Sequence, residues 1–459
     1  MKRGIIHLYR ILVPNEKSRY RLAELANMFL PATDYEFLAE TDSSHSFDLI
    51  VGETEGNGNR QKQIVYDFFT ERTGRTLDWG ILTGVRPVKL LAELLSRQSP
   101  QEVQTTLRNE YRVSSEKVEL LLDVYKTQTT VHFDPAPPAV GLYVGIPFCP
   151  SRCLYCSFPS NVISEEEARH YLEALYKEID AVSGMLTANG WYSESIYIGG
   201  GTPTSLDSED FKNLLQRISQ RFKTKQTREF TVECGRPDTI DRDKLNAILE
   251  HGAERISINP QTMADRTLER IGRSHSAQQI RDAFTLANAS GIPMINADLI
   301  AGLPGEEVSD FSRSLEEVLK LKPANITVHT LAVKKASRLI EEDQDYAYRR
   351  GVAAKEMLAL GHETLGREGY RPYYLYRQKH MAGNLENVGY ALPGTESLYN
   401  IRIMAEDQSI IALGAGGISK MYYPEENRLE RIPNVTNYRI YIERIDEMIQ
   451  RKGKGIQWS

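Results

Sequence analysis

Short apolar runs alternate with longer amphipathic segments along the chain from residue 141 to residue 331. The short runs are rich in β-branched side chains, which is typical of buried strands. The segments between them repeat their apolar residues every three or four positions, which is typical of helices that pack on one face. This alternation predicts an α/β fold with a parallel sheet, closed fully or partly into a (β/α) barrel. The six predicted strands cover residues 141–146, 195–198, 229–233, 255–259, 294–300 and 325–331.

The regions on either side of the predicted barrel have different patterns. The N-terminal region mixes strand-like pieces at 5–12 and 46–53 with three helical ones, and we expect a separate α+β domain of unknown role. The C-terminal region opens in a segment dense in tyrosine and basic residues and ends in an amphipathic helix at 437–452. We expect it to form a C-terminal extension that packs beside the barrel mouth, on the substrate side. The predicted boundaries are 1–133 for the N-terminal domain, 134–140 for a proline-rich linker, 141–375 for the barrel and 376–459 for the C-terminal region.

Composition narrows the class of protein. The chain has 459 residues, a net charge of −6 at pH 7 and 41% hydrophobic residues, which suits two or three globular domains. A mildly acidic chain lacks the basic surface that contacts with nucleic-acid phosphates require. No apolar run reaches the roughly 18 residues that a membrane-spanning helix needs. We therefore expect a cytoplasmic protein that binds no nucleic acid and has no membrane span.

The chain has four cysteines, too few and too clustered for a disulfide framework. Cys149, Cys153 and Cys156 follow the first predicted barrel strand with the spacing C-x3-C-x2-C. Three thiolates can hold three corners of a [4Fe–4S] cube and leave one iron open. A structural zinc site is the alternative, but such a site normally has four ligands. Cys234 stands far from the other three and follows Glu233 on a predicted strand, so we expect a buried structural thiol on the opposite face.

Glycines and polar residues stand at the carboxyl ends of the later predicted strands. Glycines at a strand end allow a ligand to approach the backbone, although a tight turn is the alternative explanation. Barrel enzymes assemble their sites at this face, where the loops after several strands converge, although any one polar residue there could be a structural cap. The set in chain order is Gly200, Gly201, Thr202, Glu233, Gln261, Asp298 and Ala332, with Arg273 on the helical segment after Gln261.

A C-x3-C-x2-C loop after the first strand of an incomplete barrel, followed by GGGTP and these polar residues, resembles the radical S-adenosylmethionine (SAM) superfamily. The resemblance implies a partial (β/α)6-type barrel and a [4Fe–4S] cluster whose open iron chelates the amino and carboxylate groups of SAM. Reductive cleavage of SAM then yields a 5′-deoxyadenosyl radical at the cluster, so no side chain is assigned as the catalytic group. The implied cofactor contacts are Tyr143, Tyr155, Gly200, Gly201, Thr202, Glu233, Gln261, Arg273, Asp298 and Ala332.

Within the superfamily, the stretch from Tyr143 to Ala332, with DLIAGLPGE, resembles the oxygen-independent coproporphyrinogen III oxidase (dehydrogenase) family. The block WGILTGVRPVKL resembles a longer subgroup of that family. The resemblance implies an oxidoreductase of anaerobic heme biosynthesis. It would decarboxylate two propionates of coproporphyrinogen III to vinyl groups and give protoporphyrinogen IX.

Two departures from the family pattern keep an alternative open. The well-established decarboxylases carry a fourth cysteine where this chain has Phe158, a form shared with the heme-chaperone branch. That branch also carries an H-N-x-x-Y-W stretch thought to serve heme. The corresponding stretch here has Tyr399, Asn400, Ile403 and Met404, so its histidine, tyrosine and tryptophan are missing. The alternative function is therefore a heme-binding chaperone without decarboxylase activity.

A tetracarboxylate substrate requires cations in its pocket. Arg371, Arg377 and Lys379 are candidates, because arginine pairs bidentately with carboxylates and the tyrosines among them could flank a flat macrocycle. A solvated basic loop is the alternative. The implied partners are a porphyrinogen substrate and a low-potential electron donor of the flavodoxin or ferredoxin type.

Overall fold

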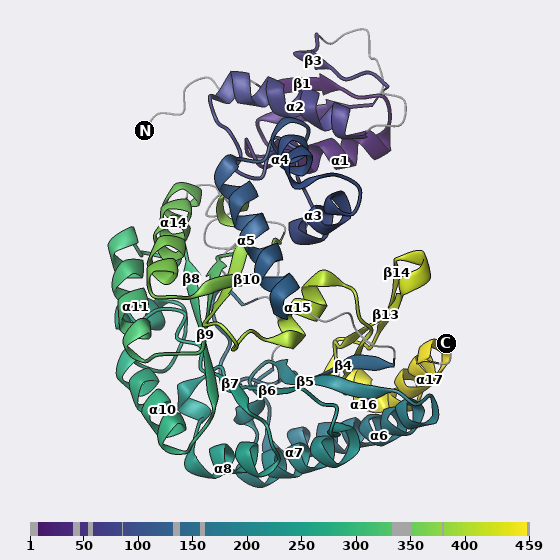
Figure 1. Cartoon of the computed structure of the whole chain (residues 1–459), viewed down its shortest axis with the longest axis vertical. Helices are drawn as coiled ribbons and strands as arrows, with labels where there is room; N and C mark the ends of the chain where they lie inside the picture. Colours follow the sequence, from purple (N-terminus) through teal and green to yellow (C-terminus); the bar gives the residue numbers. More distant parts are fainter. Residues whose placement is uncertain are drawn as a thin grey trace.

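The computed structural model describes residues 8–39, 46–53, 58–84, 86–131, 138–156, 161–332, 350–378 and 381–456. Within these residues the strands form two sheets, one of three strands and one of eleven. The small sheet and its helices lie at one end of the molecule, and the large sheet with the remaining helices forms the rest (Figure 1).

The small N-terminal sheet is parallel throughout, in the order β2–β1–β3. Two helices bury an aromatic core against it, in which the rings of Phe29 and Phe69 stack with centroids 5.7 Å apart. The strands predicted at 5–12 and 46–53 are confirmed in their described parts as β1 and β3, whereas β2 is too short for its pattern to predict it. The bounds are β1 (Tyr9–Leu12), α1 (Glu16–Ala26), β2 (Tyr35–Leu38), β3 (Leu49–Ile50) and α2 (Gly58–Thr73).

The centre of the large sheet consists of six parallel strands in chain order, as the sequence predicts. The intervening helices cover one face of the sheet (Figure 1), and each turns its apolar stripe toward the strands. The strands are β4 (Ala139–Ile146), β5 (Tyr192–Gly200), β6 (Glu229–Glu233), β7 (Arg255–Ser257), β8 (Met294–Ala301) and β9 (Asn325–Thr330). The helices are α6 (Glu165–Ala188), α7 (Ser208–Phe222), α8 (Arg242–Glu250), α9 (Asp265–Arg270), α10 (Ala277–Ala289), α11 (Val308–Lys320) and α14 (Gly351–Arg367).

The chain after α14 extends the same sheet at both ends. Next to β9 lie β11 and then β10, both antiparallel to their neighbours, and next to β4 lie β12, β13 and β14. The region expected to pack beside the barrel thus also supplies strands to it. Among the described residues the strand order has two ends, β10 and β14, which agrees with the predicted partial barrel. The bounds are β10 (Arg371–Tyr376), β11 (Asn387–Ala391), β12 (Ile410–Leu413), β13 (Ile418–Tyr423) and β14 (Arg428–Pro433).

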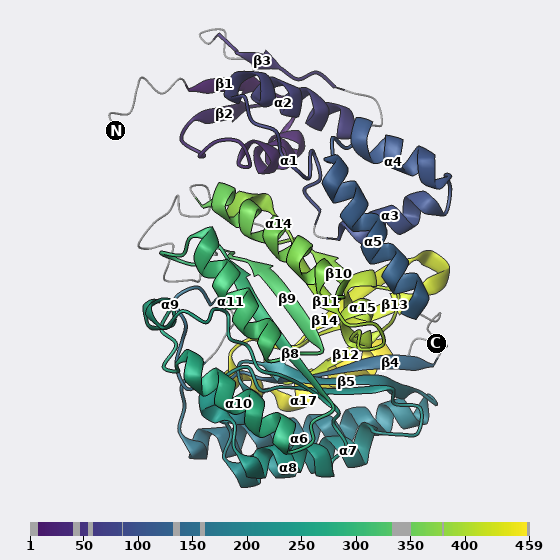
Figure 2. The same ribbon diagram turned by 60° about the vertical axis from the view of Figure 1, so that its left-hand side comes forward.

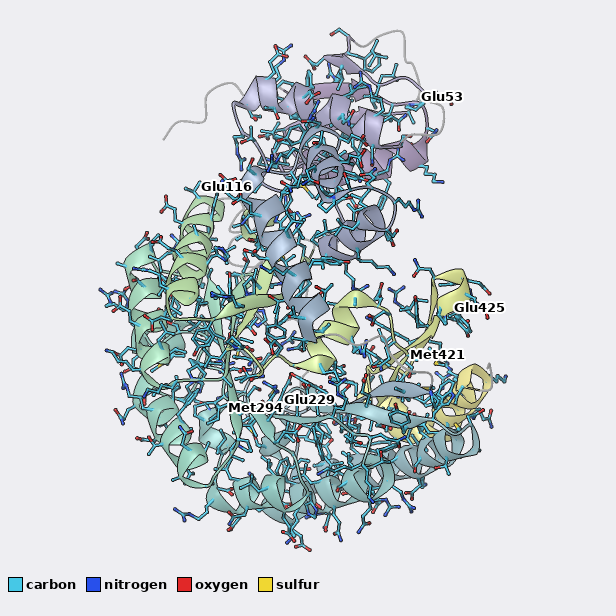
Figure 3. The ribbon with its side chains drawn as sticks, viewed as in Figure 1. Glu53, Glu116, Glu229, Met294, Met421 and Glu425 are labelled. Carbon is cyan, nitrogen blue, oxygen red and sulfur yellow. The ribbon has the colours of Figure 1, made fainter. Side chains whose placement is uncertain are left out.

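Helix α15 (Leu398–Ala405) and its entry loop cover the amino ends of the central strands. The carboxylate of Glu229, the first residue of β6, accepts hydrogen bonds from the Leu398 amide at 2.6 Å and the Ser397 hydroxyl at 2.8 Å (Glu229 is labelled in Figure 3). Asn325, the first residue of β9, donates through its side chain to the Thr395 carbonyl at 2.7 Å. The opposite, carboxyl ends of the strands are where the predicted site residues lie.

Three helices of the N-terminal region connect the small sheet to the barrel. They are α3 (Pro87–Leu95), α4 (Pro100–Asn109) and α5 (Ser115–Val131). Helix α5 packs along β10, and α3 contacts α5, β10 and α15 (Figures 1 and 2). The N-terminal region therefore lies against one end of the open sheet.

The C-terminal amphipathic segment forms two helices, α16 (Tyr438–Glu443) and α17 (Ile445–Ile456), so the prediction of one helix at 437–452 is wrong at Arg444. A fully buried ion pair anchors α17, because Lys452 Nζ lies 2.5 Å from Glu178 Oε1 on α6. The other oxygen of Glu178 accepts a hydrogen bond from the Gly414 amide at 2.8 Å. Helix α17 is thereby attached to α6, and the same carboxylate also binds the glycine-rich loop after β12.

Candidate active site

The cysteine loop leaves the carboxyl end of β4 and is held by its neighbours. The Cys149 amide donates to the Asn161 carbonyl at 3.1 Å, and the Leu154 amide donates to the Ile271 carbonyl at 2.9 Å. The Cys149 sulfur lies 3.4 Å from the hydroxyl of Thr202, which follows β5. All three cysteines of the loop are partly exposed, so their thiols are not part of the apolar core.

No three His, Cys, Asp or Glu side chains in the described ranges lie close enough together to hold a metal ion. A single zinc ion binds thiolates at about 2.3 Å, whereas a [4Fe–4S] cube takes each thiolate on a different iron. The assignment of Cys149, Cys153 and Cys156 as cluster ligands stays a prediction from their spacing.

The glycines after β5 allow the strand end to approach the cysteine loop. A Cβ on Gly201 would lie 2.4 Å from the Phe148 carbonyl oxygen, and Gly200 has a φ of +111°. The Gly201 amide donates to the Ile146 carbonyl at 2.8 Å, and the Thr202 amide donates to the Phe148 carbonyl at 2.7 Å. The glycines therefore have a packing reason of their own, in addition to the predicted approach of a ligand.

Glu233 ends β6 and is held by two donors from β5. The Tyr197 hydroxyl donates to Glu233 Oε1 at 2.6 Å, and the Gly200 amide donates to Oε2 at 3.1 Å. Burial raises the pKa of Glu233 to about 7, and the neighbouring Asp298 adds to the rise. The carboxylate thus lies beside the glycine turn and gains or loses its proton near neutral pH.

Three tyrosine rings pack in parallel beside this carboxylate. The rings of Tyr197 and Tyr399 stack with centroids 4.5 Å apart, and Tyr143 stacks on Tyr197 at 6.3 Å. Burial raises the pKa of all three phenols, so they stay protonated at neutral pH and their hydroxyls can donate hydrogen bonds. Tyr143 is a predicted cofactor contact, whereas Tyr197 and Tyr399 were not predicted.

A second polar group is formed by side chains from β8, β9 and β10. His329 Nε2 lies 3.5 Å from Asp298 Oδ2, and its Nδ1 lies 3.4 Å from the Tyr376 hydroxyl. Both ring nitrogens of His329 therefore face a polar partner. The structure thus places Asp298, a predicted cofactor contact, beside an imidazole.

Gln261 is unusual in both backbone and side chain. Its φ of +66° is in the left-handed region, which is uncommon for residues with a Cβ and clusters at functional sites. Its amide donates to the Asp298 carbonyl at 2.8 Å and its carbonyl accepts from the Ile300 amide at 2.9 Å. The segment after β7 therefore continues to pair with β8 at Gln261. Its side-chain oxygen is buried without a hydrogen-bond partner in the described residues. Ala332 follows the carboxyl end of β9 and forms an antiparallel bridge with Met381.

Arg273 connects the cysteine loop to the loops after β6 and β7. Its guanidinium donates to the Asn259 carbonyl at 2.7 Å and to the Gly235 carbonyl at 3.2 Å. It also lies 3.4 Å from the hydroxyl of Tyr155, which stands between two of the cysteines. The structure therefore brings together Tyr155 and Arg273, which are both predicted cofactor contacts.

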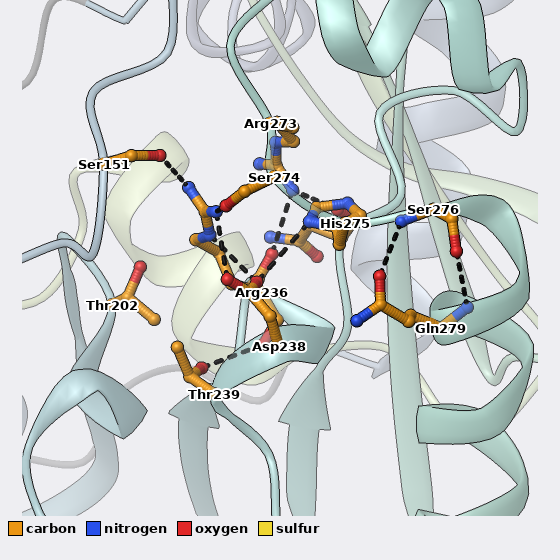
Figure 4. A network of polar contacts seen from close by, with 12 residues as sticks. Ser151, Thr202, Arg236, Asp238, Thr239, Arg273, Ser274, His275, Ser276 and Gln279 are labelled. Atoms are coloured by element: carbon orange, nitrogen blue, oxygen red, sulfur yellow. Dashed lines mark hydrogen bonds and ion pairs between the residues drawn. The ribbon is translucent and has the colours of Figure 1, made fainter.

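Sequence reasoning missed Arg236, which also contacts the cysteine loop, through Ser151 (Figure 4). Its buried guanidinium donates to the hydroxyls of Ser151 at 2.8 Å and Ser274 at 2.7 Å. It also donates two hydrogen bonds of 3.1 Å to the Asp238 carboxylate. Ser151 lies between the first two cysteines. The signal that could have found this arginine is an acid two residues away in the loop that follows a strand.

The structure does not bring together Arg371 and Arg377, two of the three predicted substrate cations. Arg371 is exposed at the start of β10, whereas Arg377, after the end of β10, is buried. The Arg377 guanidinium donates to the carbonyls of Leu82 at 2.5 Å and Asn384 at 2.8 Å. Lys379 lies outside the described residues. The observed partners of Arg377 are thus backbone atoms that join the N-terminal and C-terminal regions.

Replacing Arg377 with methionine is expected to lower the free energy of unfolding by about 2 kcal/mol. The change leaves two carbonyls without a donor and removes the guanidinium, whose carbon lies 5.2 Å from the centre of the Trp79 ring. Arg371→Met is the matched control, and its exposed position predicts a loss below about 0.5 kcal/mol. Urea unfolding measures both values, and equal losses would contradict the assignment.

Comparisons with known proteins agree with this geometry. The sequence model of the radical SAM superfamily matches residues 143–318. The oxygen-independent coproporphyrinogen-III oxidase-like protein HemZ of Bacillus subtilis is 38% identical over 405 residues, which cover 87% of this chain and 81% of that protein.

The chain belongs to the radical SAM superfamily and to its oxygen-independent coproporphyrinogen oxidase-like family.

Two other relatives show the breadth of this family. The heme chaperone HemW of Bacillus subtilis is 31% identical over 60% of this chain and 69% of its own length. The structure of coproporphyrinogen III oxidase (HemN) of Escherichia coli matches 71% of this chain and 73% of its own, with a TM-score of 0.54 and 20% identity. The predicted fold is therefore confirmed, and the family includes proteins of both names.

Membership in the superfamily implies a [4Fe–4S] cluster and SAM as cofactors, and the residues present fit both. Three partly exposed thiols lie on one loop. A Cβ on Gly199, near the end of β5, would lie 2.7 Å from the Glu233 carboxylate, so this glycine leaves the space next to Glu233 open. The buried side-chain oxygens of Gln261 and Asn259 have no hydrogen-bond partner in the described ranges, so they can accept bonds from a polar ligand.

Two further observations concern the burial of Cys234 and the length of the helices. Cys234 is fully buried, as predicted, and burial raises the pKa of its thiol. Among the helices of the described residues, none is both long enough and apolar enough to cross a membrane.

Proposed function

We propose that this chain is an oxygen-independent coproporphyrinogen III dehydrogenase that converts two propionates of its substrate to vinyl groups. The observation that carries the proposal is the extent of the similarity to HemZ, which covers 87% of the chain. Residues 141–459 make up less than that share, so the match must continue into the N-terminal region. Similarity to the HemW of Bacillus subtilis covers only 60%.

The stretch that matches the heme segment of the chaperone branch supports the same choice. Tyr399 lies in the tyrosine stack, and the side chain of Asn400 donates to the Tyr373 hydroxyl at 3.1 Å. Arg402, on the same helix, is buried and its Nε lies 3.1 Å from Glu194. These side chains are engaged in the interior of the protein, which favours a structural role for α15 over heme ligation.

When bound, the cluster and SAM would supply a carbon radical able to remove a hydrogen atom from the β-carbon of a propionate. Loss of CO2, with transfer of the remaining electron to a one-electron acceptor, would leave the vinyl group. Cys149, Cys153 and Cys156 would hold the cluster. The Glu233 carboxylate would accept hydrogen bonds from the SAM ammonium group. The tyrosine stack would exclude water, because a reactive radical requires a dry pocket.

The remaining polar residues would position these groups. Arg236 and Arg273 contact the cysteine loop at two of its residues, Ser151 and Tyr155 respectively. Asp298 holds the imidazole of His329 at the end of β9. Arg371 pairs with Ala391, which pairs with the first residue of β9, so Arg371 lies at the edge of the sheet opposite to the site. Arg377 bonds to backbone carbonyls, so Lys379 remains the candidate for substrate capture.

An anaerobic assay tests the proposal. Reconstituted protein is incubated with a reductant, SAM and coproporphyrinogen III, and mass spectrometry follows 5′-deoxyadenosine and the porphyrin products together. We expect the loss of two CO2 from the substrate in step with formation of 5′-deoxyadenosine. Formation of 5′-deoxyadenosine with coproporphyrinogen unchanged would contradict the proposal.

Heme carriage is the second candidate, because Phe158 gives this chain the C-x-F form of the chaperone branch. Phe158 lies outside the described residues. A titration with heme in the same preparation separates the two functions. Stoichiometric binding and transfer of heme, without decarboxylation, would assign the chain to the chaperone branch.

A further inference from the structure

Four cations surround one carboxylate where α3, the end of α15, β13 and β14 meet. Arg86 forms an ion pair with Glu406, and Lys89 Nζ lies 3.9 Å from the other oxygen of the same carboxylate. Lys420 Nζ and Arg431 Nη2 lie 3.6 Å and 3.7 Å from Glu406 Oε1. The start of α3 and the β13–β14 hairpin, which are far apart in the sequence, therefore place their positive charges around a single negative one.

The charges in this cluster do not balance. Among the described residues, the ion pairs of these four cations all go to Glu406, which leaves an excess of three positive charges. The side chains of Lys420, Arg86 and Lys89 are only 13%, 20% and 25% exposed. Partly buried charges are costly unless they are paired. Burial, together with the repulsion of Arg86 and Arg431, lowers the pKa of Lys420 to about 8.

The start of α3 adds a further positive element at the same place. Arg86 is the N-cap residue of this nine-residue helix and makes no side-chain capping bond. The first turn contains Pro87 and no acidic residue. The first amides of a helix carry a partial positive charge that favours an anion. The helix start and the four side chains therefore favour the same kind of ligand.

We propose that Arg86, Lys89, Lys420 and Arg431 bind a compact multivalent oxyanion of the phosphate class. The four cations all lie within 4 Å of one carboxylate, which suits a small ligand with several oxygens. Arginine pairs bidentately with such groups, and lysine binds them as a point charge. The site is separate from the cofactor residues, and its existence does not depend on the proposed decarboxylation.

The site gives a role to the block WGILTGVRPVKL, which the proposed reaction leaves unexplained. Trp79 Nε1, at the start of this block, donates to Glu386 at 2.7 Å, and Leu82 accepts from Arg377. These contacts fix the block to the β10–β11 end of the open sheet. Arg86 and Lys89, further along, face the β13–β14 end. A bound oxyanion would therefore strengthen the connection between the two ends.

Thermal unfolding of the full-length protein in inorganic phosphate, compared with chloride at equal ionic strength, tests the site. We expect a saturable rise of Tm of about 2 °C or more in phosphate alone. Lys420→Met should remove most of this rise. Lys212→Met is the matched control, because Lys212 pairs with Glu250 on the exposed surface, and it should keep the rise.

Glu406→Gln distinguishes a binding site from an ion-pair clamp. Removing the carboxylate increases the positive excess, so the variant should bind phosphate at least about fivefold more tightly and show a larger rise of Tm. If the cluster were only an ion-pair clamp, Glu406→Gln would lower the Tm and phosphate would not restore it. Equal Tm in phosphate and chloride for the wild type would overturn the proposal, even where the variant fails to fold. A saturable effect of tricarballylate without one of phosphate would overturn the assignment to the phosphate class.

Discussion

Replacing Cys153 with alanine is expected to abolish the reaction. The variant keeps only two of the three thiolates that the C-x3-C-x2-C loop can offer, and a [4Fe–4S] cluster with an open iron requires three. After anaerobic reconstitution we expect the iron content and the visible absorption of the cluster to fall to background. Formation of 5′-deoxyadenosine should fall by more than about a thousandfold.

Cys234→Ala is the matched control for this experiment. Cys234 directly follows β6 and is fully buried in the hydrophobic core. Its replacement removes a small buried group, so we expect a loss of stability of about 1 kcal/mol with iron content unchanged. Full iron content in Cys153→Ala, or loss of the cluster in Cys234→Ala, would contradict the predicted ligand set.

The barrel strands could be predicted because their pattern is local. Each of the six central strands is a short β-branched run followed or preceded by an amphipathic helix, and parallel strands of this kind place their carboxyl ends at one edge. Strand β11 is added at one end of the six central strands, next to β9, and β12 is added at the other end, next to β4. Both partners lie far away in the sequence. Such pairings leave no local pattern.

The site could be predicted in part for the same reason. Glu233 ends β6 and Asp298 lies within β8, and the structure places them close enough for Asp298 to raise the pKa of Glu233. Tyr399 could not be predicted, because it reaches Tyr197 from a helix some 200 residues away. Arg377 lies in a basic segment whose composition suits a substrate pocket, but it bonds to the Leu82 carbonyl of the N-terminal region. Composition indicates what a side chain can bind, whereas its partner depends on the tertiary fold.

Glu233→Gln is expected to change stability and cofactor binding in opposite directions. Burial raises the pKa of Glu233 to about 7, above its ordinary value of 4.5. Between these values the folded protein holds a proton that the unfolded chain has released, so stability falls as the pH rises through this window and levels off above pH 7. Glutamine removes this effect. The variant should match the wild type at pH 5 and exceed it by up to about 3 kcal/mol at pH 8.5.

Binding of SAM should respond with the opposite sign. The proposed contact between Glu233 and the SAM ammonium requires the ionised carboxylate, so the affinity of the wild type should fall about tenfold per pH unit below pH 7. Glu233→Gln should weaken binding at pH 8 by about 30-fold and flatten this pH dependence. Calorimetric titration with SAM at pH 6 and pH 8 measures both effects.

Glu254→Gln separates the two consequences of a buried carboxylate. Burial also raises the pKa of Glu254, which accepts a hydrogen bond from the Phe230 amide at 2.8 Å, near the amino end of β6. This control should share the gain in stability at high pH but leave SAM affinity unchanged, because it lies at the edge of the sheet opposite to the site. If Glu233→Gln gained stability and kept its affinity for SAM, Glu233 would be a structural acid that holds Tyr197 and Gly200. A loss of affinity confined to Glu233→Gln would instead mean that the protein retains a buried charge there, at a cost in stability, because the cofactor requires it.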